Sequence, residues 1–570
     1  MDLNKQKTTN KMTTKGITNT TKILFAAALI GLSACKNDID NTAINGNKIN
    51  TTIEIVEQEY QSTSPVTRAV INNSSIQNSE LVGDLTDCSA YSDVVPNLSE
   101  TQSASTRALS KPTHYTVRFY LGSTKAGELK GTLNGSTFTA DPSTPNKLIL
   151  ERGKTYTFIC FNDDVVTNGE TLEVSLNKAA TARIGRSTFT TTTTKEGQKV
   201  QLVAKHAGVK VRTQILAQKH HLESFKAKFL SNSTEIPNKV AYDPISGTYT
   251  TISTAALAEV TNDSPKSNEK VYEASDYGKN YSYTSSGPWH YLLPGTNAKH
   301  LKLNISDGKI FWNKIQGTIN NLVKTDELLT ANGTYTIQVK MKPNFTYLFS
   351  DGTTGTLPKN PSKTPIAVVV EPDKHIAAAI KEAGDGAVYK WSTAIYNRQY
   401  TNTHNASEGD GTAQNYIPYN VTGGYSETWD PNYSTNIVTD NKVKGENPNF
   451  PAFYAAAHFN PGVPLGPSLI NRKWFLPTQY EYFFAYEYIG FSHNAMTTKA
   501  LNSPRYYYGY LYEAAFVAAG GRAFLANGIE NYWTSTSHNG GGRSVPTKSY
   551  AGSPTNHRFY EYKVRAFIAY

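Results

Sequence analysis

Hydrophobic and polar residues alternate with a period of two in several short stretches that begin at residue 113. In HYTVRFYL, one set of alternate residues is hydrophobic or aromatic: Tyr115, Val117, Phe119 and Leu121. Such alternation predicts a strand with one buried face. It recurs in KLILERGKTYTFICFND, on either side of an Arg-Gly turn. Short strands separated by turns predict a β-sandwich over residues 113–216.

The alternation continues in KVQLVAKHAGVKVRTQI, where Val200 and Leu202 are followed, after His206-Ala-Gly, by Val209 and Val211. This spacing predicts a hairpin. Further strands are expected in PWHYLLPGT, in HLKLNI and, as a closing strand, in NGTYTIQVKMK. We interpret residues 217–345 as a second β-sandwich.

The pattern changes near Phe345. Four of the six tryptophans and 22 of the 36 tyrosines lie between residues 389 and 570, which indicates a separate unit over residues 346–570. YLFSDGTTGTL and KTPIAVVV predict two strands joined by a turn. KHIAAAIKEAG predicts a helix that ends at Gly384, because its hydrophobic residues recur at helical spacing. NGGGRSVP, residues 539–546, is expected to be a loop.

A second helix is predicted after NRKWFLPTQYE, because Thr478 is followed three residues later by Glu481. At this spacing each side chain can accept a hydrogen bond from the other residue's backbone N–H. The helix would bury one face, made of Tyr482, Ala485, Tyr486 and Ile489, and would end at Gly490. Thr478 and Glu481 are therefore interpreted as structural residues, packed near Trp474 and Trp533.

The first 34 residues resemble a secretion signal, with five lysines and an apolar run of ten residues, 23–32, that is too short to span a bilayer. The run ends in LSAC, which is similar to a bacterial lipobox and predicts lipid attachment at Cys35. Five lysines and Asp2 contribute +4 of the net +10, so about +6 remains on the other 536 residues. No basic run or motif indicates a nucleic-acid partner.

Residues 35–112 are rich in Asn, Ser and Thr and are predicted to be a polar tether or propeptide with one strand, Thr51–Glu57. The two other cysteines, Cys88 and Cys160, could form a disulfide. Cys160 falls in the apolar row of a strand, where a free cysteine commonly acts as a small hydrophobic residue.

The stretches YTVRFYL, GKTYTFICFND, KHAGVKV and NGTYTIQVKMK together resemble the fimbrillin-like lipoproteins of Bacteroidales, the subunits of type V pili. The resemblance covers residues 110–345 and implies two transthyretin-like β-sandwiches. It also implies that an arginine-specific protease removes a first strand, and that a strand of another subunit fills the groove. The candidate cleavage sites are Arg107, which is preferred because it precedes the first sandwich strand, and Arg68; an uncleaved chain remains the alternative.

The stretches WFLPTQYEY, ENYWTSTS and YKVRAFIAY resemble the W-R-L-P-T-x-x-E-W and Y-W-T-S-T pattern of C-type-lectin-like domains. This resemblance covers residues 347–570 and implies an α+β fold. Phe475 and Tyr482 replace the usual Arg and Trp, and the calcium motifs of lectins are missing. The expected fold class is therefore mainly β, with two β-sandwiches followed by this α+β domain.

No catalytic, metal or cofactor motif is present in the sequence, and the formylglycine-generating relatives of the C-terminal fold need cysteines that residues 346–570 lack. The acidic loop HNASEGDGTAQN does not follow a calcium-loop pattern. The densest aromatic stretch, RYYYGYLYEAAF, has the aromatic faces that glycan or protein recognition uses. The alternative is that these tyrosines bury their rings within the fold and keep only the hydroxyl groups in water. The candidate ligand-binding residues are Tyr506, Tyr507, Tyr508, Tyr510 and Trp429.

The sequence thus predicts a non-enzymatic adhesion protein of the bacterial surface, an accessory or tip subunit of a type V-like pilus (fimbria). Its expected partners are other subunits, joined by strand exchange, a surface glycan or protein, and the outer membrane through a lipid anchor. The alternative is an uncleaved outer-membrane lipoprotein that binds glycans directly. The tip position is favoured because KVRAFIAY is expected to be used inside the C-terminal domain rather than donated to a neighbour.

Overall fold

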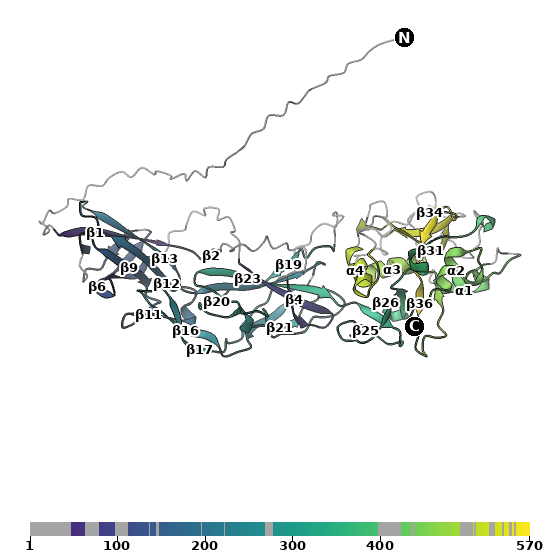
Figure 1. Cartoon of the computed structure of the whole chain (residues 1–570), viewed down its shortest axis with the longest axis horizontal. Helices are drawn as coiled ribbons and strands as arrows, with labels where there is room; N and C mark the ends of the chain where they lie inside the picture. The colour runs from purple at the N-terminus through teal and green to yellow at the C-terminus, as the bar shows by residue number, and fades with distance from the viewer. Residues whose placement is uncertain are drawn as a thin grey trace, which may run out of the picture. The chain divides into compact units, whose positions relative to one another are not determined.

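Figure 1 shows the chain as a computed structural model built mainly of β-strands, with four α-helices in its described part, all after residue 423. The structure describes residues 47–62, 79–96, 112–135, 137–143, 148–194, 197–221, 223–267, 278–396, 423–434, 437, 439–490, 505–506, 509–523, 530–538, 541–546, 550–551 and 555–570. No helix among these residues is long and apolar enough to cross a membrane.

The first sheet has eight strands in the order β13-β12-β9-β5-β6-β7-β1-β8. β13 also pairs with β1, so the sheet closes on itself. Its strands are β1 (Lys48–Glu57), β5 (Thr113–Leu121), β6 (Thr124–Asn134), β7 (Thr137–Ala140), β8 (Leu148–Glu151), β9 (Thr155–Asn162), β12 (Arg183–Thr190) and β13 (Gln198–His206).

A four-stranded sheet covers the outer face of β5 and β9. It has the order β10 (Val166–Asn168), β11 (Thr171–Ser175), β16 (Ile236–Tyr242) and β17 (Tyr249–Ala255). Tyr115 and Val117 of β5 lie in the core inside the closed sheet, whereas Tyr120 lies in a second core with Leu172 and Val240. β5 is present as predicted, but both of its faces are buried, because two layers of sheet pack here.

Two further sheets enclose the largest core, which includes Val211, Phe229 and Ile337. The seven-stranded sheet contains β19 (Tyr283–Ser286), β14 (Val209–Ala217), β23 (Gly333–Pro343), β4 (Cys88–Pro96) and β3 (Glu80–Asp84) in this order, with β20 (His290–Leu292) on β14 and β2 (Gln61–Ser62) on β23. The four-stranded sheet has the order β18 (Val260–Thr261), β15 (Lys226–Ser231), β21 (Leu301–Asp307) and β22 (Gly317–Ile319).

The predicted hairpin of KVQLVAKHAGVKVRTQI is wrong, because β13 and β14 lie in different sheets. β13 pairs with β12 and β1, while β14 pairs in parallel with β23. Gly208 lies so close to Ala179 that a Cβ atom would be 2.1 Å from its carbonyl oxygen. The short link between the strands is therefore fixed against another segment and does not form a hairpin turn. β14 also begins before residue 216, the boundary expected from the sequence.

The described residues between 35 and 112 form four strands, β1 to β4, where the sequence predicts a tether with one. β1 contains the predicted strand Thr51–Glu57. The unexpected β4 forms nine residue pairs with β23, from Pro96 opposite Tyr335 to Cys88 opposite Pro343. Its buried residues include Ser89, Ala90 and Ser92, and such small and polar residues do not give a hydrophobic alternation.

The C-terminal part combines sheets and helices. A six-stranded sheet has the order β25 (Thr354–Thr356), β24 (Thr346–Phe349), β26 (Pro365–Glu371), β27 (Ile376–Ala379), β36 (Phe567–Ala569) and β29 (Trp474–Phe475). A five-stranded sheet has the order β28 (Val388–Lys390), β35 (Glu561–Lys563), β31 (Asn531–His538), β32 (Gly541–Pro546) and β34 (Thr555–Asn556), and β30 (Arg505–Tyr506) pairs with β33 (Tyr550–Ala551). The helices are α1 (Gly424–Trp429), α2 (Pro451–Ala457), α3 (Gln479–Gly490) and α4 (Gly509–Ala518).

Two sequence predictions for this part are wrong. The helix expected in KHIAAAIKEAG is strand β27, whose four residues are all buried between β26 and β36. His375, just before it, has a φ of 55°, which a continuous α-helix does not allow. Strand pairing on both sides thus overrides the helical preference of alanine. Residues 541–546, expected to be part of a loop, form β32 against β31.

Candidate functional site

The segment from Lys48 to Ser62, named here the N-terminal strap, comprises β1, a short connection and β2. β1 runs parallel to β13, from Thr51 opposite Gln198 to Glu57 opposite Ala204, and its other side faces β7. Ile49 and Ile55 are fully buried in the core of the closed sheet. The strap is thus the first part of the chain in the sheet, and it fills a groove between strands that follow much later in the sequence.

Polar contacts hold the strap where β1 ends. Tyr115 on β5 donates a hydrogen bond of 2.8 Å from Oη to the Glu57 carboxylate. Arg183 on β12 donates to the Gln58 carbonyl oxygen at 2.6 Å and to Glu59 Oε1 at 3.0 Å. Burial acts to raise the pKa of Glu59, but the charge of Arg183 and the contact with His206 hold it below its usual value.

The strap then passes over His206. The Tyr60 ring stacks on the His206 ring at 3.8 Å between centroids, and Tyr60 Oη donates to the Ala179 carbonyl oxygen at 2.7 Å. Burial, and then the charge of Arg183, lower the pKa of His206 to about 4, so this imidazole is neutral at pH 7. No local pattern identifies Arg183 or His206, because their partners lie more than 120 residues away in the sequence.

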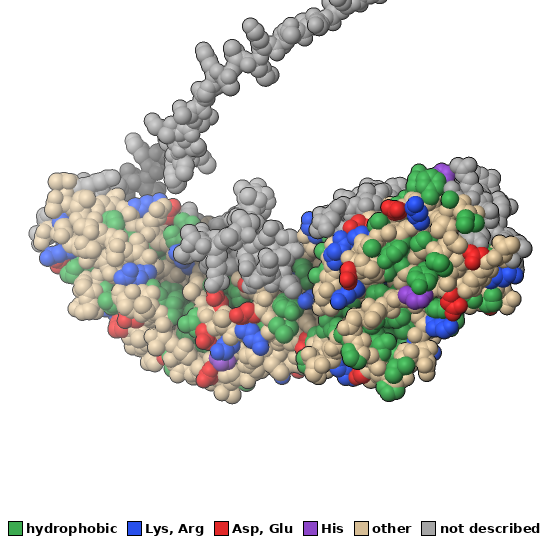
Figure 2. Space-filling model, turned by 45° about the vertical axis from the view of Figure 1, so that its right-hand side comes forward, with side chains coloured by type: hydrophobic (Ala, Val, Ile, Leu, Met, Phe, Trp, Pro, Cys, Tyr) green, Lys and Arg blue, Asp and Glu red, His purple; other side chains and the backbone are tan. Residues whose placement is uncertain are grey.

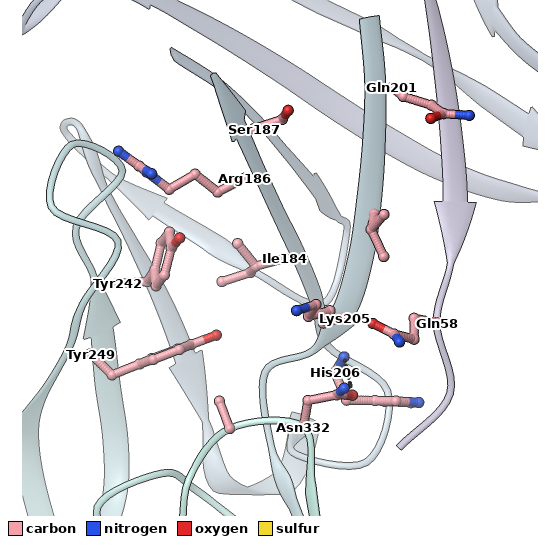
Figure 3. Close-up of a pocket in the computed structure, with 12 residues that line it drawn as sticks. Gln58, Ile184, Arg186, Ser187, Gln201, Lys205, His206, Tyr242, Tyr249 and Asn332 are labelled. Carbon is pink, nitrogen blue, oxygen red and sulfur yellow. Dashed lines mark hydrogen bonds between the residues drawn. The ribbon is translucent and has the colours of Figure 1, made fainter. Parts of the chain in front are cut away.

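A pocket of about 520 Å³ lies beside this end of the strap. Figure 3 shows Tyr242 and Tyr249 on one side and Gln58 and Lys205 on the other, with Ile184 between them. Arg186 reaches its rim but donates to the carbonyl oxygens of Pro244 and Ile245 at 3.1 and 2.7 Å. The pocket therefore offers aromatic and amide groups and the exposed Lys205, whereas Arg186 is already used within the protein.

The structure describes the side chains of only some of the predicted ligand-binding residues. The Trp429 ring is half-buried, with Nε1 donating to the Trp474 carbonyl oxygen at 2.8 Å and Lys473 Nζ 4.1 Å from the ring centroid. Tyr510 lies in α4 and is half-buried. Tyr506 belongs to β30, but its side chain, like Tyr507 and Tyr508, lies outside the described residues. These five residues therefore remain predictions as a binding site.

The residues proposed as structural are buried. Thr478 N donates to Glu481 Oε2 at 2.7 Å and Glu481 N donates to Thr478 Oγ1 at 3.1 Å, which are the two hydrogen bonds that their spacing predicts. Trp474 and Trp533 are at most 4% exposed, and Trp533 Nε1 donates to the Tyr389 carbonyl oxygen at 2.7 Å. The predicted face of α3 is confirmed, since Tyr482 and Ile489 are each 1% exposed.

The last strand, β36, is used inside the C-terminal part. It lies between β27 and β29, with Ile568 opposite Ala377 and Trp474. Arg565, just before it, is 1% exposed and donates to the carbonyl oxygens of Ala379 and Ile380 and to Glu382 Oε1. The chain end is thus an internal element of this sheet.

The remaining candidate groups are metal ligands and cysteines. The part of the chain that the structure describes holds no cluster of three or more His, Cys, Asp or Glu side chains that could bind a metal. Cys88 and Cys160 are free and buried, and burial raises the pKa of both thiols. Cys35, Arg68, Arg107 and the acidic loop 404–415 lie outside the described residues. Figure 2 shows positive and negative side chains interspersed on the visible face.

The fold is that of a mainly β protein in which the first described strand, β1, docks into a sheet formed by later strands. No protein-family model and no curated protein matches the chain.

Several solved structures of Bacteroides proteins do match. A fimbrial protein from Bacteroides ovatus is 11% identical, with 92% of this chain and 99% of that chain covered and a TM-score of 0.22. A fimbrial protein from Bacteroides vulgatus is 14% identical, with 40% and 91% covered and a TM-score of 0.25. A Bacteroides uniformis protein, whose description proposes a role in cell adhesion, is 15% identical, with 40% and 90% covered and a TM-score of 0.27. With TM-scores below 0.5, these similarities do not define the function of this chain.

Proposed function

We propose that this chain is a non-enzymatic adhesion subunit of a surface fimbria, exported as a lipoprotein through Cys35 and joined to another subunit by strand exchange. Removal of the N-terminal strap opens the groove between β13 and β7, and an extended strand of a partner subunit fills it. Backbone hydrogen bonds supply affinity in such pairing, and alternate side-chain pockets supply specificity.

The observation that carries this proposal is the strap itself. β1 is the N-terminal strand, it pairs in parallel with β13 over seven residues, and its loss would expose the core around Ile49 and Ile55. Some of the matched Bacteroides proteins are described as fimbrial, which agrees with the proposal. In the sequence, the candidate cleavage site Arg68 lies six residues after the strap.

The position of β4 favours Arg68 over Arg107 as the cleavage site. Cleavage after Arg68 removes only the strap. Cleavage after Arg107 also removes β3 and β4, and β4 forms nine residue pairs with β23 and buries Cys88 and Ala90 in the largest core. Loss of β3 and β4 together with the strap would open two hydrophobic cores at once. This would cost far more folding free energy than opening the strap groove alone.

The position of β36 supports a terminal place in the fimbria. β36 lies between β27 and β29 and is occupied within its own sheet, so it is not available for donation to another subunit. The strap groove, in contrast, can accept a partner strand. We therefore propose a tip or accessory subunit, with the C-terminal part as the adhesive unit.

N-terminal sequencing of the protein released from the cell surface tests the proposal. A mature chain that starts at Ala69 agrees with the proposal. A start at Ala108 would still support strand exchange but would show that the cleavage site is Arg107. A surface chain that keeps lipid-modified Cys35 and the strap would contradict it.

The second candidate function is direct glycan binding by an uncleaved, outer-membrane-anchored lipoprotein. The pocket beside the strap favours it, because Tyr242 and Tyr249 offer aromatic faces across the pocket from the amide of Gln58. Binding of glycans by the full chain, with loss on Tyr249→Ala and retention on Tyr291→Ala, would support this function. Tyr291 is a matched control because it is a 37% exposed tyrosine outside the pocket.

A further inference from the structure

The groove under the strap is apolar along most of its length and polar at one end. Alternate residues of β1 face the core, and at this face the row runs Ile49, Thr51, Ile53, Ile55 and Glu57. Ile49, Ile53 and Ile55 pack with hydrophobic residues of the closed sheet, which include Val200 and Leu202 of β13. At Glu57 the row ends in a carboxylate, so the groove has an apolar part and a polar end.

Three side chains form that polar end, and each comes from a different strand. Tyr115 (β5) is fully buried, His206 (β13) is 6% exposed and the Arg183 side chain (β12) is 11% exposed. Tyr115 donates to Glu57 at 2.8 Å, Arg183 donates to Glu59 at 3.0 Å, and His206 Nε2 lies 3.5 Å from Glu59. When the strap leaves, these hydrogen bonds are lost together.

The backbone at two of these residues, Arg183 and His206, is held by contacts that do not involve the strap. Arg183 N donates to Asn162 Oδ1 at 2.9 Å, and His206 N donates to Asn332 Oδ1 at 3.1 Å. Arg183 and His206 are also paired across β12 and β13. A buried donor group costs free energy when it has no acceptor, so the emptied groove favours an occupant that brings one.

Glu54 provides an internal comparison on the same strand. Its side chain points the other way and contacts Lys199 Nζ at 2.8 Å and Gln201 Nε2 at 2.7 Å. The side chains of Glu54 and Glu57 are each 18% exposed, but Lys199 is 57% exposed whereas Arg183 is 11% exposed. The contact of Glu54 with an exposed lysine therefore contributes little compared with the contacts at the polar end.

Resting on the proposed function, we propose that the groove selects a partner strand by its carboxylates. The partner strand carries an apolar residue where Ile55 lies, an acidic residue two positions later and a second acidic residue two positions after that. A basic residue at either acidic position is rejected, because its charge would lie beside that of Arg183, whose side chain is 11% exposed.

A peptide exchange experiment tests this proposal. The full chain is cleaved with an arginine-specific protease and incubated with fluorescent peptides of residues 48–62, whose binding is followed by anisotropy. The three peptides are the natural sequence, a Glu57→Gln and Glu59→Gln double variant, and a Glu54→Gln control. We expect the double variant to bind about ten- to a hundredfold more weakly than the natural peptide, and the control to bind within about threefold of it.

A protein variant ties the effect to the polar end. Tyr115→Phe keeps the ring in the core and removes only the hydroxyl donor, and we expect it to reduce the difference between the natural and the doubly substituted peptide at least threefold. Equal binding of those two peptides would overturn carboxylate selection while leaving the strand groove intact. Failure of all three peptides to bind would overturn the proposed function and this inference with it.

Discussion

At the scale of single residues, the clearest case is the pair at the start of α3. Thr478 and Glu481 are each at most 4% exposed and exchange two hydrogen bonds, so they act as a capping box. Burial raises the pKa of Glu481 to about 7. The unfolded chain has the ordinary, lower pKa, so the folded state binds this proton more tightly and loses stability as pH rises from about 4.5 to about 7.

Glu481→Gln should therefore keep the cap and weaken this pH dependence, because the amide oxygen can accept the same hydrogen bond without a charge. Thr478→Ala should remove one cap bond and cost about 1 kcal/mol. The free energy of unfolding of the C-terminal part, measured from tryptophan fluorescence at pH 5 and pH 7.5, checks both. Thr250→Ala, an exposed strand residue, is the control. A Glu481→Gln variant with an unchanged pH profile would contradict the role of the buried carboxyl.

His221 gives the opposite pH dependence at the same scale. Burial lowers the pKa of His221 to about 4, and its Nδ1 accepts a hydrogen bond of 3.2 Å from Ser267 N. The unfolded chain takes up this proton near pH 6.5, so stability is complete above that pH and is lost as pH falls toward about 4. We expect His221→Gln to reduce the loss of unfolding free energy between pH 7.5 and pH 4.5 by about 1–3 kcal/mol.

At the scale of elements, the position of a strand in its sheet determines what its removal does to the fold, as β36 and β1 show. β36 lies inside the six-stranded sheet, and Arg565 beside it forms a buried ion pair with Glu382 at 2.9 Å. Deletion of residues 564–570 should unfold the C-terminal part, because it removes an internal strand and leaves Glu382 without this partner. Loss of its cooperative melting transition would confirm this. A folded C-terminal part combined with abolished assembly would show instead that β36 is donated to another subunit.

β1 depends on hydrophobic anchors. Ile55→Ala should destabilise docking of the strap by about 2–4 kcal/mol, since Ile55 is fully buried. Hydrogen exchange of the backbone amides of β1 measures this effect, and β23 serves as an internal reference. Ile252→Ala, at a position that is 48% exposed on β17, is the matched control. Equal exchange in both variants would contradict the anchoring role of Ile55.

The sequence predicted individual elements better than their partners. β5, β21, β23 and α3 follow from alternation, from helical spacing and from one capping pair. The β13–β14 hairpin was wrong, because alternation predicts a strand without specifying which strand it pairs with. The helix predicted in place of β27 was wrong for a different reason: four small or apolar residues that are buried on both faces fit a strand or a helix.

At the scale of the whole molecule, the first two described segments, residues 47–62 and 79–96, are shared between separate sheets. β1 completes the closed sheet, whereas β3 and β4 complete the seven-stranded sheet. Cleavage at Arg68 should therefore leave the second core intact, and cleavage at Arg107 should not. Arg68→Lys and Arg107→Lys variants, treated with an arginine-specific protease and heated, separate the two cases. We expect the variant that is cut only at Arg68 to keep the higher melting temperature.

Some candidate sites could be predicted from a local sequence pattern, and others depend on strands that are distant in the sequence. The strap strand could be predicted because Thr51–Glu57 alternates, whereas the polar end of its groove could not, because Tyr115, Arg183 and His206 come from three strands far apart in the chain. The sequence by itself determined the mainly β composition, the capped helix α3 and the candidate export and cleavage sites. Only the tertiary structure decided which strands pair, that β36 is internal and that carboxylates of the strap meet buried donors. The physical reason is that local patterns encode which face of an element is buried, while pairing depends on contacts between residues that are distant in sequence.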